Sequence, residues 1–380
     1  MPWQEVSAVE LRKEFVSLAS QEGANVRALC RRFGISPGTG YKWLERARRG
    51  EPLEDYSRRP RHSPSRSSQA LESQVIALRQ AHPAWGARKL AKRLEVLGVE
   101  VPAASTVHAI LVRHGLISAA SSEAAHAWQR FEHAQPNDLW QMDFKGHVPM
   151  DRKRCHPLTI LDDHSRYAVC LKACPDEREP TVKASLIAAF RRYGLPARMT
   201  MDNGSPWGDD SQSYTGLDVW LMGHGIRVSH SRPYHPQTQG KDERFHRTLK
   251  AEVLQGPPFA DLNRAQAAFD HWRRIYNTER PHQALGMAVP VSRFQPSGRV
   301  YTDIPPPPEY GPEDTVRKVQ DQGRISWNGE TWRVGKAFIG ERVALRPAAE
   351  ADTYDVYWSR IRIARIELQT RTVITGKRIT

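Results

Sequence analysis

Apolar residues recur every three or four positions over the first 50 residues, which predicts helices. Leu11, Phe15 and Leu18 form one such stripe. A second helix is expected after Asn25, and a third after Ser36, because both residues can cap a helix N-terminus. Between them the sequence FGISPG supplies a glycine to stop the second helix and a proline suited to the first turn of the third.

The third of these helices is strongly basic. A helix, a short glycine-containing turn and a basic helix are typical of a helix-turn-helix unit, whose second helix enters the DNA major groove. An ordinary helical hairpin is the alternative. We predict a helix-turn-helix DNA-binding domain over residues 1–50 and a basic linker over 51–68. The DNA contacts expected from the basic helix are Lys42, Arg46, Arg48 and Arg49.

The helical spacing returns over residues 69–118. Leu90, Leu94 and Leu97 mark one stripe, and a further helix is expected to begin near Ser105. This segment predicts a second helix-turn-helix domain, with a simple packing module as the alternative. The Ala- and Ser-rich residues 119–134 are predicted to form a connecting helix.

After residue 135 the apolar spacing changes from the helical period to alternation. In LWQMDF, apolar Trp140 and Met142 alternate with polar Gln141 and Asp143, which indicates a strand. The segments that follow read as two strands, a helix, a strand, a helix, a short strand and further helices. This order predicts an α/β domain over residues 135–298.

The C-terminal part is predicted to be all β. The sequence PPPPEYGP lies in a stiff linker, residues 299–315. Beyond it, GRISWNGETWRVG contains an Asn328-Gly329 pair, which favours a hairpin turn. The spacing of ERVALRP, TYDVYW and RIARIEL adds further strands. Residues 316–380 are therefore predicted to form a small β-barrel.

The charge of the chain favours a polyanionic partner. Lys and Arg number 56 against 42 Asp and Glu, giving a net charge of +14 and a pI near 9.8. Nucleic acid or an acidic membrane surface would fit. No apolar run reaches the roughly 18–20 residues of a membrane span, and no apolar signal segment opens the sequence. We expect a soluble, cytosolic protein.

Four cysteines in 380 residues are too few for a disulfide scaffold. Cys170 and Cys174 lie four residues apart, with His156 and His164 upstream, so a zinc site is conceivable. No compact CxxC or HxxxH pair supports it, and cysteines in a predicted strand are more commonly part of the core.

Three acids stand out by their positions. Asp143 lies in the first predicted strand, Asp202 ends the fourth, and Glu243 falls in the first turn of the following helix. Open α/β sheets place their functional sites at strand ends. Three carboxylates without a thiol or imidazole favour hard cations such as Mg²⁺ or Mn²⁺. Two such ions, roughly 3.5–4 Å apart, support phosphoryl transfer.

The helix around Glu243 carries an acid among cations. A helix there places Glu243, Arg247 and Lys250 on one face, with Phe245 and Leu249 toward a core. A metal-binding acid must lie near the scissile phosphate while cations hold the remaining DNA backbone. The alternative is a surface Glu243 paired with Arg247 at i,i+4.

The stretch RPYHPQTQGKDERFHRTLK, residues 232–250, resembles the sequence around the catalytic glutamate of bacterial insertion-sequence transposases of the DDE type. These enzymes share their catalytic core with retroviral integrases. LWQMDF, LDDHSRY, MDNG and YNTERPHQAL match further motifs of that family, and RRFGISPGTGYKWL and HPAWGARKL resemble its tandem helix-turn-helix region. The resemblance covers nearly all of the chain.

This resemblance implies a central RNase H-like integrase core that uses two Mg²⁺ or Mn²⁺ ions. It also implies a homo-oligomer that brings two DNA ends together. The family's catalytic and metal-binding acids fall on Asp143, Asp202 and Glu243.

The other acids nearby are not expected to be ligands. The interval between Asp202 and Glu243 is longer than is usual in the family, with the surplus in the polar loop SPWGDDSQSYTG. Asp242 falls about 100° around the helix from Glu243 and is expected to point elsewhere. The remaining acids set aside are Asp162, the closest rival, and Asp163, Asp209 and Asp210.

The sequence therefore predicts a transposase that binds the ends of a mobile element. Metal-activated water would cleave a strand at its 3′ end, and the freed 3′-OH would attack target DNA by transesterification. A helix-turn-helix regulator with an inactive core is the alternative, and a Mg²⁺-dependent nuclease without strand joining is a third possibility. The core residues expected to contact DNA are Tyr234, His235, Gln237, Lys241, Arg244, Arg247 and Lys250.

Overall fold

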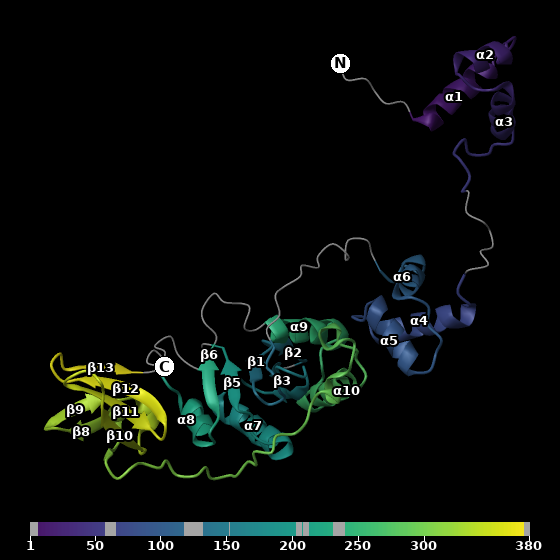
Figure 1. The fold of residues 1–380 in the computed structure, drawn as a ribbon. Helices are drawn as coiled ribbons and strands as arrows, with labels where there is room; N and C mark the ends of the chain where they lie inside the picture. The colour runs from purple at the N-terminus through teal and green to yellow at the C-terminus, as the bar shows by residue number, and fades with distance from the viewer. Residues whose placement is uncertain are drawn as a thin grey trace. The chain divides into compact units, whose positions relative to one another are not determined.

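The computed structural model describes residues 7–57, 66–117, 132–151, 153–202, 207, 213–230 and 240–375. It divides into two compact units, Met1–Ser67 and Ser68–Thr380 (Figure 1). Some sequence predictions lie outside the described residues: nearly all of the connecting helix, and the residues Asp209, Asp210, Tyr234, His235 and Gln237.

The first unit contains the three predicted helices, α1 (Ala8–Ala19), α2 (Val26–Arg32) and α3 (Pro37–Arg48). Each begins at a polar cap whose side-chain oxygen accepts a backbone N–H of the first turn. The helices surround a small core. Its fully buried members are Phe15, Cys30 and Leu44.

The second unit opens with three more helices, α4 (Gln69–Ala81), α5 (Ala87–Val96) and α6 (Ala104–Arg113). Their apolar stripes meet in a core that also receives Ile275 from a later helix. An ion pair of 2.6 Å between Arg93 of α5 and Glu279 adds a second link to that later region. The core's fully buried residues are Val75, Trp85, Leu90, Leu94, Val107, Ile110 and Leu111.

A mixed six-stranded sheet forms the centre of the second unit. Its order is β2-β3-β1-β5-β6. β4 also pairs with β3, beyond the short part of β3 that pairs with β2. β1 runs antiparallel to β3 and parallel to β5. The predicted α/β arrangement is confirmed, with the short β2 as an addition. The strands are β1 (Trp140–Phe144), β2 (Val148–Pro149), β3 (Arg154–Asp162), β4 (Ala168–Cys174), β5 (Arg198–Met201) and β6 (Arg227–His230).

Helices cover both faces of this sheet (Figure 1). On one face α7 (Glu179–Tyr193) and α8 (Gly216–Gly223) bury Trp140 and Met142 of β1. The alternation of β1 explains this, because every second side chain projects to the same face. Two later helices bury the apolar residues on the opposite face.

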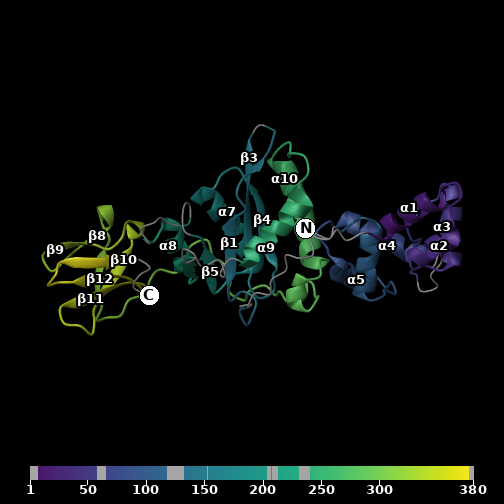
Figure 2. The same cartoon turned by 90° about the horizontal axis from the view of Figure 1, so that it is seen from above.

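The opposite face is covered by α9 (Gly240–Leu249) and α10 (Leu262–Thr278), and α9 continues as a π-helical turn, Lys250–Leu254. Phe245 and Leu249 of α9 are buried against the sheet. Figure 2 shows α10 running beside β4.

Asn277 of α10 joins that helix to the edge of the sheet. Its side-chain oxygen accepts the Ala168 N–H at 2.8 Å, and its amide donates to the Ala168 carbonyl at 3.1 Å. The side chain thereby satisfies both backbone groups that a neighbouring strand would otherwise pair.

The C-terminal strands form an open sheet in the described residues. Its order β13-β12-β11-β10-β7 has two ends, so the predicted closed barrel is not confirmed. The hairpin β8 (Arg324–Trp327) and β9 (Glu330–Arg333) is confirmed, with its turn at Asn328 and Gly329, whose φ values are 52° and 74°. The sheet strands are β7 (Thr315–Lys318), β10 (Arg342–Pro347), β11 (Thr353–Trp358), β12 (Ile361–Glu367) and β13 (Thr372–Thr375).

The segment predicted as a linker is bound to the core at its first residue. The Arg299 guanidinium donates to the carbonyls of Pro196, His224 and Gly225, at 2.5, 2.9 and 2.9 Å. None of the helices in the described ranges is long and apolar enough to span a membrane.

The tight crossing of α3 with its neighbours gives a stability prediction. A methyl group at Gly40 would overlap Cys30 Sγ and lie 2.9 Å from Phe15 Cζ. Gly40→Ala should therefore lower the unfolding free energy of the first unit by about 1–3 kcal/mol. Gly38→Ala on the same helix is the control, because its nearest neighbour lies 3.9 Å away.

The control should be neutral or stabilising by up to about 1 kcal/mol, because alanine favours helix over glycine. Urea unfolding followed by circular dichroism, with hydrogen exchange at α3 amides, measures both changes. Equal stability of the two variants would contradict the packing described here.

Candidate active site

The pairing of β1 with β5 places two of the predicted acids side by side. Trp140 pairs with Met199 and Gln141 with Thr200, in a parallel register. The same offset carried two residues further sets Asp143 beside Asp202, which directly follows β5. Residues that are paired in this way project to the same face of a sheet.

The Asp143 carboxyl group is affected by burial and by its neighbour Asp202. Burial raises the pKa of Asp143 to about 7, and the nearby Asp202 charge adds to the shift. The Asp143 side chain is 25% exposed and Asp202 is exposed, so solvent reaches the pair. Two carboxylates that resist joint ionisation attract a cation, which removes the repulsion.

Glu243 lies on the exposed face of α9, together with Arg247 and Lys250, while Phe245 and Leu249 are buried. This is the helix orientation that the sequence predicts. Within the described parts of the chain, no three His, Cys, Asp or Glu side chains gather closely enough to hold a metal ion. The structure therefore brings Asp143 and Asp202 together and leaves Glu243 on an adjoining helix.

Asp242 does point away from Glu243, and it points into the protein. It is 1% exposed, and neither carboxylate oxygen has a hydrogen-bond partner among the described residues. Burial raises its pKa well above the ordinary value, followed by the charges of Asp143 and Asp163. An unpaired buried carboxylate is costly, and a cation nearby would offset that cost.

The donor set fits a hard divalent cation. Asp143 and Asp202 offer only carboxylate oxygens, which Mg²⁺ and Mn²⁺ prefer. The cysteines do not compete. Burial raises the pKa of Cys170 to about 12 and that of Cys174 to about 11, as expected of core thiols.

His246 belongs to this site, although the sequence analysis did not select it. Its Nε2 lies 2.8 Å from the Thr159 Oγ1, and its Nδ1 lies 3.8 Å from Asp143 Oδ2. Burial lowers the pKa of His246 to about 4, with a smaller contribution from Lys145, so the imidazole is neutral at pH 7. Its position four residues after Asp242 was the available signal, since i and i+4 share a helix face.

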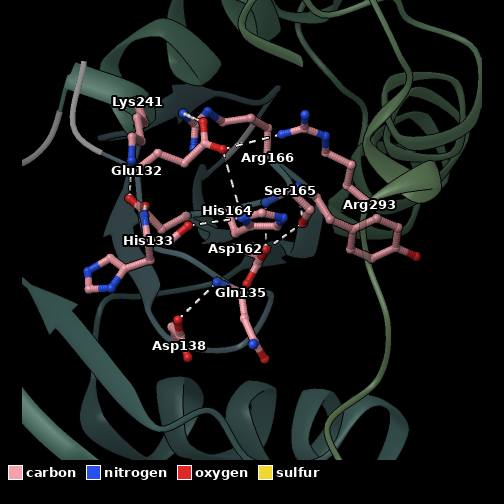
Figure 3. A network of polar contacts seen from close by, with 12 residues as sticks. Glu132, His133, Gln135, Asp138, Asp162, His164, Ser165, Arg166, Lys241 and Arg293 are labelled. Atoms are coloured by element: carbon pink, nitrogen blue, oxygen red, sulfur yellow. Dashed lines mark hydrogen bonds and ion pairs between the residues drawn. The ribbon is translucent and has the colours of Figure 1, made fainter. Parts of the chain in front are cut away.

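The LDDHSRY motif forms a network of hydrogen bonds next to the site. Asp162 accepts the backbone N–H groups of Ser165 and Asn137, at 2.8 and 2.7 Å. Asp163 accepts the His133 N–H at 2.9 Å and the Gln141 side-chain amide at 3.2 Å. These bonds fix the turn between β3 and β4 at the start of the core (Figure 3).

The same network anchors the first turn of α9. Lys241, labelled in Figure 3, forms an ion pair with Asp163. The Lys241 side chain is only 19% exposed. Burial lowers the pKa of Lys241. Glu132 completes the network by accepting from Arg166 at 3.0 Å and from Arg293 at 3.3 Å. Lys241, expected on a DNA-binding surface, thus has an internal partner.

The four basic residues predicted to contact DNA from α3 fall into two groups. Arg46 is 7% exposed, donates to the Pro52 carbonyl and stacks over Tyr56 at 3.9 Å. Lys42, Arg48 and Arg49 are exposed, and Arg49 pairs with Glu45 at 3.0 Å.

Comparisons with known proteins match this organisation. Family models for the integrase core domain match residues 133–236 and 224–290. A model of the IS481 family transposase C-terminal domain matches residues 314–374. Homeodomain-like and helix-turn-helix models match residues 39–111 and 11–61. The chain therefore combines helix-turn-helix domains, an integrase core and a transposase C-terminal domain.

Similar full-length proteins come from bacterial insertion elements. An uncharacterized 31.7 kDa protein of IS407 from Burkholderia multivorans is 28% identical over 170 residues, which are 45% of this chain and 59% of that protein. An uncharacterized 39.2 kDa protein of IS476 from Xanthomonas euvesicatoria is 27% identical over 250 residues, covering 62% and 67% of the two chains. A putative IS5376 transposase from Geobacillus stearothermophilus is 21% identical, covering 64% and 62%.

Solved structures give a weaker likeness. A simian T-cell lymphotropic virus intasome chain is 14% identical, with a TM-score of 0.39, covering 80% of this chain and 98% of that one. The HTLV-2 integrase catalytic core domain in complex with magnesium is 16% identical, with a TM-score of 0.33, covering 42% and 97%. The family models and insertion-element proteins confirm the resemblance to DDE-type insertion-sequence transposases.

The raised pKa of Asp143 gives a stability prediction for the metal-free protein. The group is protonated in both states below its ordinary pKa of 3.8, and stability falls as pH rises toward the folded value of about 7. Asp143→Asn removes this loss. The variant should be more stable than wild type at pH 8 by at most about 4 kcal/mol, and equally stable near pH 4.

Asp176→Asn is a control of opposite sign. Hydrogen bonds from the Thr181 hydroxyl and the Arg178 N–H lower the pKa of Asp176, so its ionised form stabilises the fold at pH 8. Urea unfolding from pH 4 to pH 8 in the presence of a chelator distinguishes the two variants. Parallel curves for wild type and Asp143→Asn would contradict the raised pKa of Asp143.

Proposed function

We propose that this chain is a DDE transposase with an RNase H-like core. Its helix-turn-helix domains bind the ends of a mobile element, and the core cleaves a strand at its 3′ end with water. The freed 3′-OH then joins to target DNA by transesterification. The observation that supports this most is the juxtaposition of Asp143 and Asp202 on neighbouring strands, beneath the helix that carries Glu243.

In this proposal Asp143, Asp202 and Glu243 hold two Mg²⁺ or Mn²⁺ ions. When bound, such ions supply activation of the attacking hydroxyl and stabilisation of the leaving oxygen. The protein itself orients the three carboxylates. Asp143 and Asp202 are fixed by the sheet, whereas Glu243 is carried on α9, whose first turn is anchored by the Lys241–Asp163 pair.

The DNA backbone is proposed to lie along the exposed face of α9. Arg247 and Lys250 flank Glu243 on that face, and the exposed Arg244 lies beside it. Lys241 acts by holding the helix. The predicted DNA contacts of Tyr234, His235 and Gln237 remain part of the proposal. In the first unit Lys42, Arg48 and Arg49 contact phosphates, whereas Arg46 holds the segment after α3.

Three further features belong to this proposal. The chain acts as a homo-oligomer that brings two DNA ends together. It acts on DNA of the nucleoid in the bacterial cytoplasm. The C-terminal strands, residues 316–380, form a small β-barrel.

A helix-turn-helix regulator with an inactive core is the second candidate. One observation favours it: Glu243 is exposed, and the described residues contain no three-ligand metal cluster. The buried, unpartnered Asp242 beside Asp143 argues for an active core, because a relic site would not be under pressure to keep such a costly group.

Substitution of the acids separates these functions. Asp143→Asn and Glu243→Gln should each reduce cleavage and joining of element-end DNA by at least about 10³-fold, because each removes a metal-binding charge. Binding to the same DNA should persist. Asp270→Asn, an exposed acid on α10, is the matched control and should leave both activities unchanged.

A gel assay with labelled 3′ ends and Mg²⁺ measures cleavage and joining separately. Cleavage without joining in the wild type would favour the nuclease. Binding without either reaction would favour the regulator.

The basic helix α3 gives a second test. Arg48→Ala should weaken binding to end DNA and reduce the slope of log affinity against log salt by about one, because it removes one phosphate contact. Arg46→Ala should instead lower the melting temperature of the first unit, because Arg46 bonds Pro52 and stacks on Tyr56. An unchanged slope for Arg48→Ala, measured from 50 to 200 mM salt, would remove this residue from the interface.

A further inference from the structure

His246 contacts two neighbouring strands of the sheet, β1 and β3. It lies on the buried face of α9 and is 7% exposed. Its ring reaches Thr159 on β3 and Asp143 on β1. A side chain that meets three elements at one point limits how the helix can shift against the sheet.

The hydrogen bonds assign the position of the imidazole proton. The Thr159 hydroxyl has one proton, which it donates to the Asp143 carbonyl at 2.9 Å. The same oxygen must therefore accept from His246 Nε2, at 2.8 Å. An imidazole that carries its proton on Nε2 offers Nδ1 as an acceptor, and Nδ1 has no hydrogen-bond partner among the described residues.

That acceptor faces the Asp143 carboxylate. Nδ1 lies 3.8 Å from Asp143 Oδ2, which is too far for a direct hydrogen bond. Two acceptors this close are arranged to share one donor molecule, such as a water or a hydroxyl group.

We propose that His246 is a positioning residue for the reaction: locked by Thr159 with its proton on Nε2, it directs Nδ1 at the hydroxyl that binds beside Asp143. This rests on the proposed function, in which that hydroxyl is the attacking water or the DNA 3′-OH. No proton is transferred to His246. His246 contributes by orienting the O–H group, as residues next to metal ligands do.

Two variants of His246 test the roles of the two ring nitrogens separately. Asparagine places its polar atoms near the Nδ1 position, whereas glutamine reaches the Nε2 position and can still donate to Thr159. His246→Asn should retain joining in Mg²⁺ within about threefold of wild type, and His246→Gln should lose about 10–100-fold. Thermal unfolding checks that both variants fold.

A purely structural role gives the reverse result. Rescue by glutamine with failure of asparagine would show that only the bond to Thr159 matters, and would overturn the proposal. Equal loss in both variants, or equal retention, would also overturn it, because Nδ1 would then have no separate role.

Nitrogen NMR on the full chain labelled with ¹⁵N-histidine gives a readout independent of activity. At pH 7 the His246 signals should show a protonated Nε2 and a bare Nδ1, and added Mg²⁺ should shift the Nδ1 resonance. Thr159→Val should lose the single tautomer, whereas Thr159→Ser, which keeps the hydroxyl, should retain it.

A protonated Nδ1 in the wild type would overturn the assignment. Absence of cleavage by wild type on any end DNA would instead count against the proposed function, and the NMR result would still stand by itself.

Discussion

The parallel pairing of β1 with β5 is the constraint on which the site depends. It sets Asp143 and Asp202 at one level on neighbouring strands, where their charges repel. A slip of one residue would turn Asp143 to the opposite face, because side chains alternate along a strand. The apolar residues of β1 oppose such a slip. Trp140 and Met142 are fully buried beneath α7 and α8, and a shifted register would place them against α9.

The site also depends on the position of α9, and polar contacts fix that position. The packing of Phe245 and Leu249 presses the helix onto the sheet, but apolar contacts are not directional. The ion pair of Lys241 and the hydrogen bond of His246 are directional, and they act one turn apart. Together they fix the rotation of the helix, and hence the direction of Glu243. Asp163, which lies near the site, is thus the partner of Lys241.

The sequence predicts the helices and strands better than it predicts which side chains contact one another. Helix caps and spacing locate α1 to α3, and alternation locates β1, because these signals are local. Short strands such as β2, β7 and β13 have no such signal, since only pairing makes them strands. The burial of Asp242 and His246 could be read from a helical wheel, but their contact with Asp143 needs the position of a strand about a hundred residues earlier. Arg46 and Lys241 were expected on the surface for the same reason. A sequence shows a charge and not the carboxylate or carbonyl that folding brings to it.

In the folded chain, not all of the basic residues lie on the surface. Part of the excess positive charge is internal: Arg280 is 5% exposed and donates to the Thr248 hydroxyl, and Lys241 and Arg46 are occupied by partners. The surface available to DNA is therefore smaller than a net charge of +14 suggests. Meanwhile, the sheet places Asp143 and Asp202 side by side on its central strands, where a phosphate alone would be repelled. In the proposed function, divalent cations would neutralise these acids as a nucleic acid attracted by the surrounding cations approached.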